Sequence, residues 1–276
     1  MLELKHIAKT FNKGLANEVV LYTDLNVEIK QGEFVTIIGS NGSGKSTFFN
    51  IVSGNIRQDK GKILFKGMDN CKEGAAEGGI SNLREHKRSK FIGRVFQDPL
   101  KGTAPSLTIL ENMAMAYNKG KFYGLSRGVK PELRELFSKE LAGMHLNLEN
   151  KMDVKVGALS GGQRQALSLL MATMITPDLL LLDEHTAALD PKTSDLIIDL
   201  TEQIVKEKAI TTIMITHNLK HAIQHGNRLL MFHEGKVILD ISGEEKQKLT
   251  TEKLIEQFNS LNVIDDIGDK LAFSQM

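Results

Sequence analysis

Hydrophobic and polar residues alternate along two runs near the start of the chain, residues 2–8 and 21–29. Alternation with a period of two is typical of strands that bury one face, so both runs are predicted to lie in an antiparallel sheet. Residues 33–39 form a more continuous apolar run, which indicates a strand covered on both faces. Shorter apolar runs predict further strands at residues 61–67, 91–96, 179–183, 210–216, 228–235 and 236–241.

Elsewhere apolar residues recur three and four positions apart, which predicts helices over 106–116 and 131–144. The same spacing predicts helices at residues 163–176, 190–208 and 249–258. Strands that alternate with helices favour a parallel sheet with helical crossovers. The helical stretch 98–159 interrupts that alternation, so we expect a helical subdomain inserted into the sheet domain.

Charge and composition narrow the class of protein. With 35 Lys and Arg against 34 Asp and Glu, the net charge is +1, which gives no global electrostatic reason to expect a nucleic-acid partner. The single cysteine, Cys71, excludes an internal disulfide and fits a reducing compartment. Glu3 and Lys5 lie where a signal peptide needs an apolar core, and no apolar run approaches the ~20 residues that cross a bilayer. We therefore expect a cytoplasmic chain that reaches a membrane only through a partner.

Residues 37–47, IIGSNGSGKST, contain three glycines in six positions directly behind a predicted strand. Gly39, Gly44, Lys45 and Ser46 match the pattern G-x-x-x-x-G-K-[ST] of a phosphate-binding loop. Glycines let backbone N–H groups approach phosphate oxygens, and the N-terminus of the following helix favours negative charge. An ordinary glycine turn is the alternative, but the position between a strand and an apolar helix favours the loop. It predicts a nucleoside triphosphate with Mg²⁺, with Lys45 on the β- and γ-phosphates and Ser46 on the metal.

The stretch LSGGQ, residues 159–163, is a second candidate anion site. Ser160, Gly161 and Gly162 open a predicted helix, so a hydroxyl, bare backbone amides and a helix N-terminus come together there. The stretch argues against a P-loop kinase or GTPase, because neither needs it.

Two adjacent carboxylates, Asp183 and Glu184, stand at the end of a predicted buried strand. Phosphoryl transfer needs a cation for the developing charge and an oriented nucleophile, and two carboxylates can divide these tasks. Gln97 and His217 also follow predicted strands. Because parallel strands place their carboxyl ends along one edge of a sheet, we expect these side chains and the phosphate loop to lie at the same edge.

In order and spacing these motifs resemble those of the ATP-binding cassette family, the nucleotide-binding subunits of ABC transporters. The resemblance runs from about Leu2 to Ile241. It implies an α/β fold with a P-loop NTPase core, a mainly parallel sheet, an N-terminal antiparallel β subdomain and an inserted α-helical subdomain. It further implies a single ABC ATPase domain over 1–276, made of a RecA-like core with the β subdomain (2–97 and 160–241), a helical subdomain (98–159) and a short C-terminal helical tail (242–276).

The resemblance also assigns roles to single residues. Asp183 and Gln97 join the loop serine at Mg²⁺, and Glu184 polarises the attacking water. His217, after a predicted strand, senses the γ-phosphate; a structural histidine is the alternative. The implied catalytic set is therefore Lys45, Gln97, Glu184 and His217, and the implied metal ligands are Ser46, Gln97 and Asp183.

Contacts to ATP are implied in the same way. Phe11 stands where the family has an aromatic residue that stacks on adenine, although a plain packing role at a strand end is the alternative. The loop supplies the remaining contacts of the same chain: Ser40, Asn41, Gly42, Ser43, Gly44, Lys45, Ser46 and Thr47.

In this family the LSGGQ stretch of one subunit completes the site of a second, so that two chains enclose two ATP molecules. The implied contributions from the partner copy are Ser160, Gly161, Gly162, Gln163 and Asp190. ATP binding then stabilises the dimer by mass action, and hydrolysis releases it. Glu184 and Ser160 are present in the same chain, so we expect a homodimer with two competent sites.

One departure from the family pattern is His185, at a position where most members have proline. The change frees the backbone angle φ and restores an N–H donor. We expect activity to survive, and we expect the imidazole to have a surface or structural role.

The implied function is ATP hydrolysis (ATP and water to ADP and phosphate) that powers transport, at the cytoplasmic face of the cell membrane and through permease subunits. Residues 183–193 resemble importer ATPases that work with an extracytoplasmic solute-binding lipoprotein and carry amino-acid-like solutes. Leu107, Leu110, Met113 and Met115 are either permease-docking surface or plain core. A single-cassette ATPase not coupled to transport, such as a scaffold ATPase of iron–sulfur assembly, remains an alternative.

Overall fold

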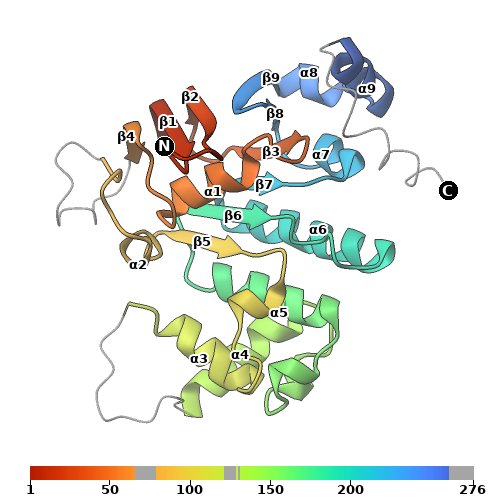
Figure 1. Ribbon diagram of the computed structural model, residues 1–276. Helices are drawn as coiled ribbons and strands as arrows, with labels where there is room; N and C mark the ends of the chain where they lie inside the picture. The colour runs from red at the N-terminus through yellow and green to blue at the C-terminus, as the bar shows by residue number, and fades with distance from the viewer. Residues whose placement is uncertain (66–78, 121–128, 130, 261–276) are drawn as a thin grey trace. The chain divides into compact units, whose positions relative to one another are not determined.

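The computed structural model (Figure 1) describes residues 1–65, 79–120, 129 and 131–260. The chain divides into two compact units. Unit 1 comprises Met1–Arg88 and Ile213–Met276, and unit 2 comprises Ser89–Thr212. Cys71 and the end of the predicted tail, residues 261–276, lie outside the described residues. Within the described part of the chain, no helix has both the length and the apolar character needed to cross a membrane.

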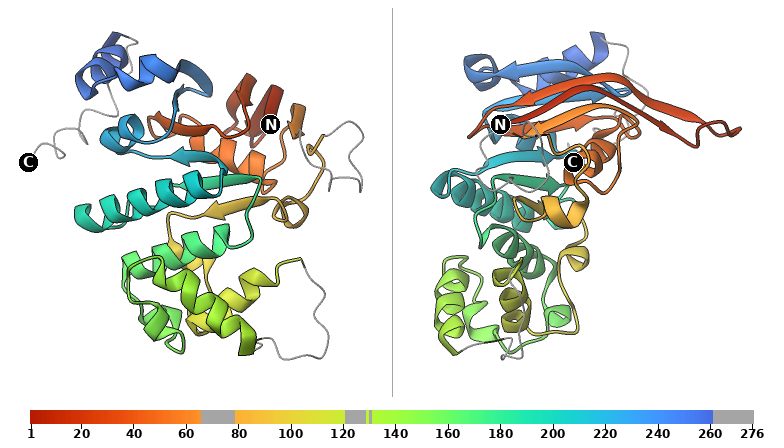
Figure 2. Two further views of the ribbon diagram at one scale, coloured as in Figure 1. Left: turned by 180° about the vertical axis from the view of Figure 1, so that it is seen from behind. Right: turned by 90° about the vertical axis from the view of Figure 1, so that its left-hand side faces the viewer.

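Unit 1 begins with a three-stranded antiparallel sheet, in which β1 (Leu2–Phe11) lies between β2 (Val19–Ile29) and β4 (Lys60–Phe65). The right-hand view of Figure 2 shows β1 and β2 side by side as a long two-stranded ribbon. Leu2 and Leu4 of β1 are buried while the residues between and after them are more exposed, as the alternation predicts. The antiparallel β sheet predicted for the N-terminal part is confirmed.

The central strand of unit 1 is β3 (Phe34–Gly39), all of whose residues are buried. It pairs in parallel with β8 (Arg228–His233), which in turn pairs antiparallel with β9 (Lys236–Ser242). β7 (Thr211–Ile215) crosses the boundary between the units and is also fully buried. The strand predicted at residues 33–39 is therefore covered on both faces, as expected, and so is the strand predicted at residues 210–216.

An arginine closes the end of the helix that follows β3. This helix, α1 (Lys45–Ser53), ends near α2 (Glu85–Arg88). Arg88 is only 2% exposed, and its guanidinium donates to the carbonyl oxygens of Ile51 at 2.7 Å and Val52 at 2.8 Å. Since the last carbonyls of a helix have no partner within it, the buried cation stabilises the end of α1.

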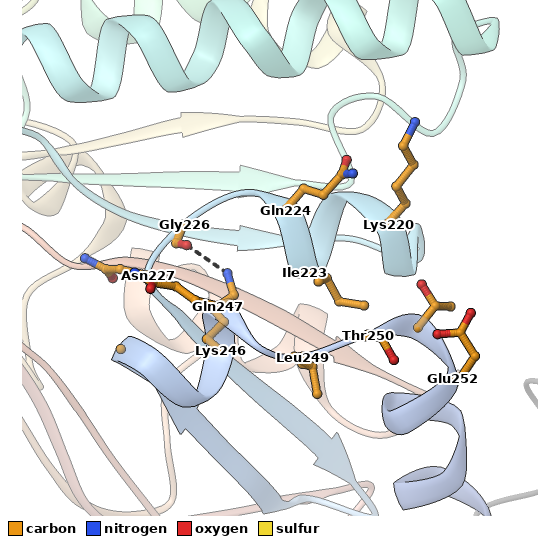
Figure 3. Close-up of a pocket in the computed structure, with 12 residues that line it drawn as sticks. Lys220, Ile223, Gln224, Gly226, Asn227, Lys246, Gln247, Leu249, Thr250 and Glu252 are labelled. Carbon is orange, nitrogen blue, oxygen red and sulfur yellow. Dashed lines mark hydrogen bonds between the residues drawn. The ribbon is translucent and has the colours of Figure 1, made fainter.

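The C-terminal part of unit 1 contains α7 (Leu219–Gln224), α8 (Gly243–Gln247) and α9 (Thr251–Ser260). Leu219 of α7, Leu249 between α8 and α9, and Leu254 of α9 belong to one apolar cluster with residues of β3, β8 and β9. A pocket of about 620 Å³ lies between these three helices, lined by Lys220, Ile223, Gln224, Gly226, Asn227, Gly243, Lys246, Gln247, Leu249, Thr250, Thr251 and Glu252. Figure 3 shows this pocket with its lining residues as sticks. None of the residues predicted to bind ATP or Mg²⁺ lines this pocket.

Unit 2 contains the parallel pair β5 (Ile92–Val95) and β6 (Leu179–Asp183). Its α-helices, labelled in Figure 1, are α3 (Ile109–Tyr117), α4 (Pro131–Ala142), α5 (Gly161–Thr173) and α6 (Pro191–Glu207). Short 3₁₀ helices also belong to this unit: η2 (Pro99–Gly102), η3 (Glu149–Lys151) and η4 (Val156–Ala158). The predicted helical stretch after residue 98 is thus helical in the described residues. How the chain divides into domains remains a prediction.

Helix α3 carries three of the four apolar residues considered as permease-docking surface or core, namely Leu110, Met113 and Met115. Thr108 and Glu111 form a capping box, so the helix begins at Ile109 and not at residue 106. Leu110 and Met113 are buried, whereas Met115 is 50% exposed. Two of the four apolar residues considered for docking are therefore core residues, and Met115 remains available on the surface.

Candidate functional site

The phosphate loop of unit 1 lies between β3 and α1, as the motif requires. The ammonium group of Lys45 donates to the carbonyl oxygens of Gly39 and Ser40, both at 2.8 Å, and the side chain is 5% exposed. Gly44 is the N-cap of α1 with φ +107° and supplies no side-chain cap, so no side chain of the cap covers the first-turn N–H groups. Asn41, Gly42 and Ser46 are exposed. The loop thus presents backbone amides, a hydroxyl and a buried cation to an anion.

A tyrosine that the sequence analysis did not single out supports this loop from β2. Tyr22 is 1% exposed, and its hydroxyl donates to the Gly44 carbonyl at 2.6 Å. A Cβ atom at Gly44 would lie 2.7 Å from that hydroxyl oxygen, so only glycine fits. The N–H of Gly235 donates to the Ser43 carbonyl at 3.1 Å from the other side. Burial raises the pKa of the Tyr22 hydroxyl well above its ordinary value, so the group remains a donor at neutral pH.

Two further predicted residues of unit 1 lie at strand ends. Phe11 is the last residue of β1 and is partly exposed, with the ammonium of Lys9 5.3 Å from its ring centre. His217 is exposed and follows β7, where the N–H of Thr216 donates to the Ile37 carbonyl of β3 at 3.1 Å. The structure therefore brings His217 to the end of the strand that leads into the phosphate loop.

In unit 2 the strand-end carboxylate Asp183 has a close cationic partner. The guanidinium of Arg94, on the neighbouring strand β5, contacts the Asp183 carboxylate at 2.7 Å, and both side chains are largely shielded from solvent. The ring of Phe96 lies 4.7 Å from the same guanidinium carbon. Sequence reasoning missed Arg94, because nothing in the local pattern shows which strand lies beside β6.

Glu184 and His185 occupy a tight turn after β6. Glu184 has a left-handed backbone conformation with φ +47°, and its carbonyl accepts from the N–H of Ala187 at 2.9 Å. His185 is 2% exposed, and its Nε2 lies 3.1 Å from the hydroxyl of Thr201 on α6. The expected surface role for His185 is therefore wrong, and the expected structural role fits.

Gln97, the glutamine predicted to contact Mg²⁺, is exposed two residues after β5. The carbonyl of the preceding Phe96 lies 3.4 Å from the amide nitrogen of Gln165, a residue of α5 that is 1% exposed. The segment carrying Gln97 is thus tied to the same helix that the LSGGQ stretch begins.

LSGGQ forms the start of α5, with Ser160 as N-cap. The Ser160 hydroxyl accepts from the N–H of Gln163 at 3.3 Å and the Gln163 side chain reaches back, which makes a capping box. The backbone N–H groups of Ser160 and Gln163 therefore both have partners within the capping box, and neither is a bare amide. The exposed Ser160 and Gly161 remain accessible from solvent.

Close packing explains one glycine of LSGGQ. A Cβ atom at Gly162 would lie 2.3 Å from the Thr193 methyl group on α6. Asp190, the N-cap of α6, is exposed, and its carboxylate accepts from the Thr193 N–H at 3.1 Å. The hydrogen bond to the Thr193 side chain is the largest cause that lowers the pKa of Asp190, and the bond to the Thr193 N–H lowers it further. The residues expected to reach a partner copy, on the turn before α6 and at the start of α5, are thus neighbours in unit 2.

Comparison with known proteins places these features in a family. The ABC transporter family model matches residues 22–187. A tyrosine transport ATP-binding protein of Clostridioides difficile (strain R20291) is 48% identical over 258 residues, which cover 94% of this chain and 98% of that protein. The methionine import ATP-binding protein MetN of Lactobacillus delbrueckii subsp. bulgaricus is 29% identical over 97% of this chain and 73% of its own length.

Among solved structures, a dimeric post-hydrolysis state of the ATP-binding cassette MJ0796 of Methanocaldococcus jannaschii, bound to ADP and Pi, is similar with a TM-score of 0.70. The two sequences are 30% identical, and the match covers 88% of this chain and 98% of the MJ0796 chain. The predicted fold class, an ABC cassette of the P-loop NTPase type, is confirmed. The chain therefore belongs to the ABC transporter family, as an ATP-binding subunit of the kind that hydrolyses ATP to power transport.

Proposed function

We propose that this chain powers the import of an amino-acid-like solute, with tyrosine as the first solute to test. The observation that carries the proposal is the similarity, 48% identity over 94% of the chain, to a protein named for tyrosine transport. The relative named for methionine import supports an amino acid as the class of solute. On this proposal the chain lies at the cytoplasmic face of the membrane, bound to permease subunits that receive solute from an extracytoplasmic lipoprotein.

The phosphate loop binds the triphosphate in this proposal. Its uncapped α1 N-terminus and the buried Lys45 ammonium attract negative charge, and the loop glycines leave the backbone amides accessible. The partly exposed Phe11 stacks on the adenine ring. Lys45 then exchanges its carbonyl partners for phosphate oxygens.

Mg²⁺ fits the chemistry of the residues proposed for it. Ser46 offers an exposed hydroxyl, Gln97 an exposed amide and Asp183 a carboxylate, all oxygen donors of the type that Mg²⁺ prefers. Among the described residues no three His, Cys, Asp or Glu side chains gather into a metal site. When bound, Mg²⁺ neutralises charge that develops on the phosphate oxygens.

Glu184 orients the attacking water and accepts its proton as the water oxygen attacks the γ-phosphorus. The bond from that phosphorus to the oxygen of ADP breaks, so ADP and inorganic phosphate result. His217, exposed at its strand end, donates a hydrogen bond to a γ-phosphate oxygen.

The active form in this proposal is a dimer of two copies. The similar MJ0796 cassette is dimeric, and Ser160, Gly161 and Asp190 are exposed on this chain. Ser160, Gly161, Gly162, Gln163 and Asp190 of one copy complete the ATP site of the other.

Solute uptake tests the proposal. Cells that lack this gene are complemented with the wild-type chain or with Glu184→Gln, and uptake of labelled tyrosine, methionine and lysine is measured. We expect the wild type to restore tyrosine uptake and Glu184→Gln to fail, because the variant binds ATP but cannot activate water. Unchanged uptake of all three amino acids in the cells lacking the gene would contradict an amino-acid importer.

A further inference from the structure

We propose that His185 is a positioning residue for Glu184: acting through Thr201, it holds the turn that carries the catalytic carboxylate in its left-handed conformation. The proposal rests on the role of Glu184 given above. It adds to that role a pair of side chains, His185 and Thr201, to which neither the motifs nor the comparisons assign a part in catalysis.

The backbone at Glu184 needs to be held. Its φ of +47° lies in the left-handed region, which residues with a Cβ atom rarely adopt. Such a conformation persists only where the surrounding structure enforces it, and it is typical of active sites. The hydrogen bond from the N–H of Ala187 to the Glu184 carbonyl lies within the turn and closes it.

His185 attaches the turn to helix α6. The imidazole is 2% exposed and Thr201 is 1% exposed, so the contact between them is shielded from water. Thr201 Oγ1 donates to the Ile197 carbonyl at 2.7 Å, which uses its only proton. The contact at 3.1 Å between His185 Nε2 and that oxygen is therefore a hydrogen bond donated by Nε2–H.

The other end of this hydrogen-bond chain is rigid. Ile197 and Thr201 belong to α6, a helix of 17 residues that is N-capped by Asp190. The turn from Glu184 to Asp190 is thus fixed to the same helix at both ends, by His185 near its start and by Asp190 at its close. A side chain placed by such packing and hydrogen bonds keeps its geometry through the reaction.

The proposal separates two properties of residue 185, its volume and its N–H donor. His185→Leu fills the space but cannot donate, whereas His185→Gln retains a donor of similar reach. On the partner side, Thr201→Val removes the hydroxyl with little change of shape, and Thr201→Ser keeps it.

We expect kcat for ATP to fall about 10- to 100-fold in His185→Leu and in Thr201→Val, because a displacement of the order of 1 Å at a catalytic group has this effect. The Kd for ATP should stay within about twofold, since the phosphate loop is unchanged. His185→Gln and Thr201→Ser should retain kcat. The double variant His185→Leu with Thr201→Val should be no slower than either single variant, since both remove the same hydrogen bond.

The results that would overturn the proposal are specific. If His185→Leu and Thr201→Val lower the melting temperature but leave kcat unchanged, the contact is structural only. If the donor variant His185→Gln is folded yet as slow as His185→Leu, the hydrogen bond is not what matters. A parallel measurement on Glu184→Gln separates this from the proposed function: should that variant hydrolyse ATP normally, the role of Glu184 itself is wrong.

Discussion

Replacing Tyr22 by phenylalanine removes one oxygen atom from beneath the phosphate loop and leaves the ring in place. Tyr22 is 1% exposed and its hydroxyl donates to the Gly44 carbonyl at 2.6 Å. The same carbonyl also accepts from the N–H of Phe48 at 2.8 Å. The substitution therefore removes one of two donors, and the carbonyl keeps a partner.

The expected cost follows from that geometry. A neutral buried hydrogen bond contributes about 0.5–1.5 kcal/mol, while a carbonyl left with no partner would cost about 1–3 kcal/mol. Because Phe48 still bonds to Gly44 and no cavity forms, Tyr22→Phe should lower the free energy of unfolding by about 1 kcal/mol, roughly a fivefold change in the equilibrium.

The pH dependence of the free energy of unfolding provides a control for the Tyr22→Phe prediction. Burial raises the pKa of Tyr22 above its ordinary value of about 10, so the folded state keeps the proton after the unfolded chain has lost it. The wild type therefore loses stability as pH rises above about 10, by at most about 1.4 kcal/mol per pH unit, and Tyr22→Phe does not lose it.

Urea unfolding followed by circular dichroism at pH 8 and at pH 10.5–11 measures both effects. The wild type should be the more stable protein at pH 8, and its advantage should shrink or reverse at the higher pH. A variant as stable as the wild type at pH 8, or a difference that is the same at both pH values, would show that the buried Tyr22 hydroxyl does not stabilise the fold in this way.

Two further predictions concern packing and capping. Gly162→Ala should destabilise the protein, because its Cβ would meet the Thr193 methyl group at 2.3 Å. Adding Thr193→Ser, which removes that methyl, to the Gly162→Ala variant should restore most of the lost stability. Thermal melting of the single and the double variant measures this. Failure of Thr193→Ser to help would place the strain elsewhere. Arg88→Met should lower the free energy of unfolding by about 1–3 kcal/mol, because the guanidinium is 2% exposed and the Val52 carbonyl at the end of α1 loses this donor, while the Ile51 carbonyl keeps the Gly54 N–H. A loss below about 1 kcal/mol would show that water replaces the arginine.

Periodicity and motif spacing predicted most of the strands because buried strands carry continuous apolar runs and the phosphate loop has a pattern of its own. The starts of helices were harder. Helix α5 begins at Gly161 and ends at Thr173, whereas residues 163–176 were predicted. The first turn of α5 was not predicted because its two glycines have low helix propensity, although the capping box of Ser160 and Gln163 marks the start of the helix.

The residues that support the site could not be predicted, because their partners are distant in the chain. Tyr22 and Gly44 are 22 positions apart, and Arg94 and Asp183 are 89 apart. Local patterns identify Tyr22 only as one residue of a half-buried strand, and Arg94 only as a polar residue in a short one. Which carbonyl or carboxylate each meets depends on strand pairing, which periodicity does not report.

We propose that each ATP is hydrolysed between two copies of the chain, and a mixture of two inactive variants tests this claim. Glu184→Gln lacks the base and Ser160→Arg blocks the LSGGQ arm, so each alone should hydrolyse almost no ATP. In a mixed dimer one site combines an intact Glu184 with an intact Ser160 from the other copy. We predict that an equal mixture regains about a quarter of the wild-type rate, since half of random dimers are mixed and each has one good site of two. A mixture as inactive as its components, or full activity in Ser160→Arg alone, would contradict the claim.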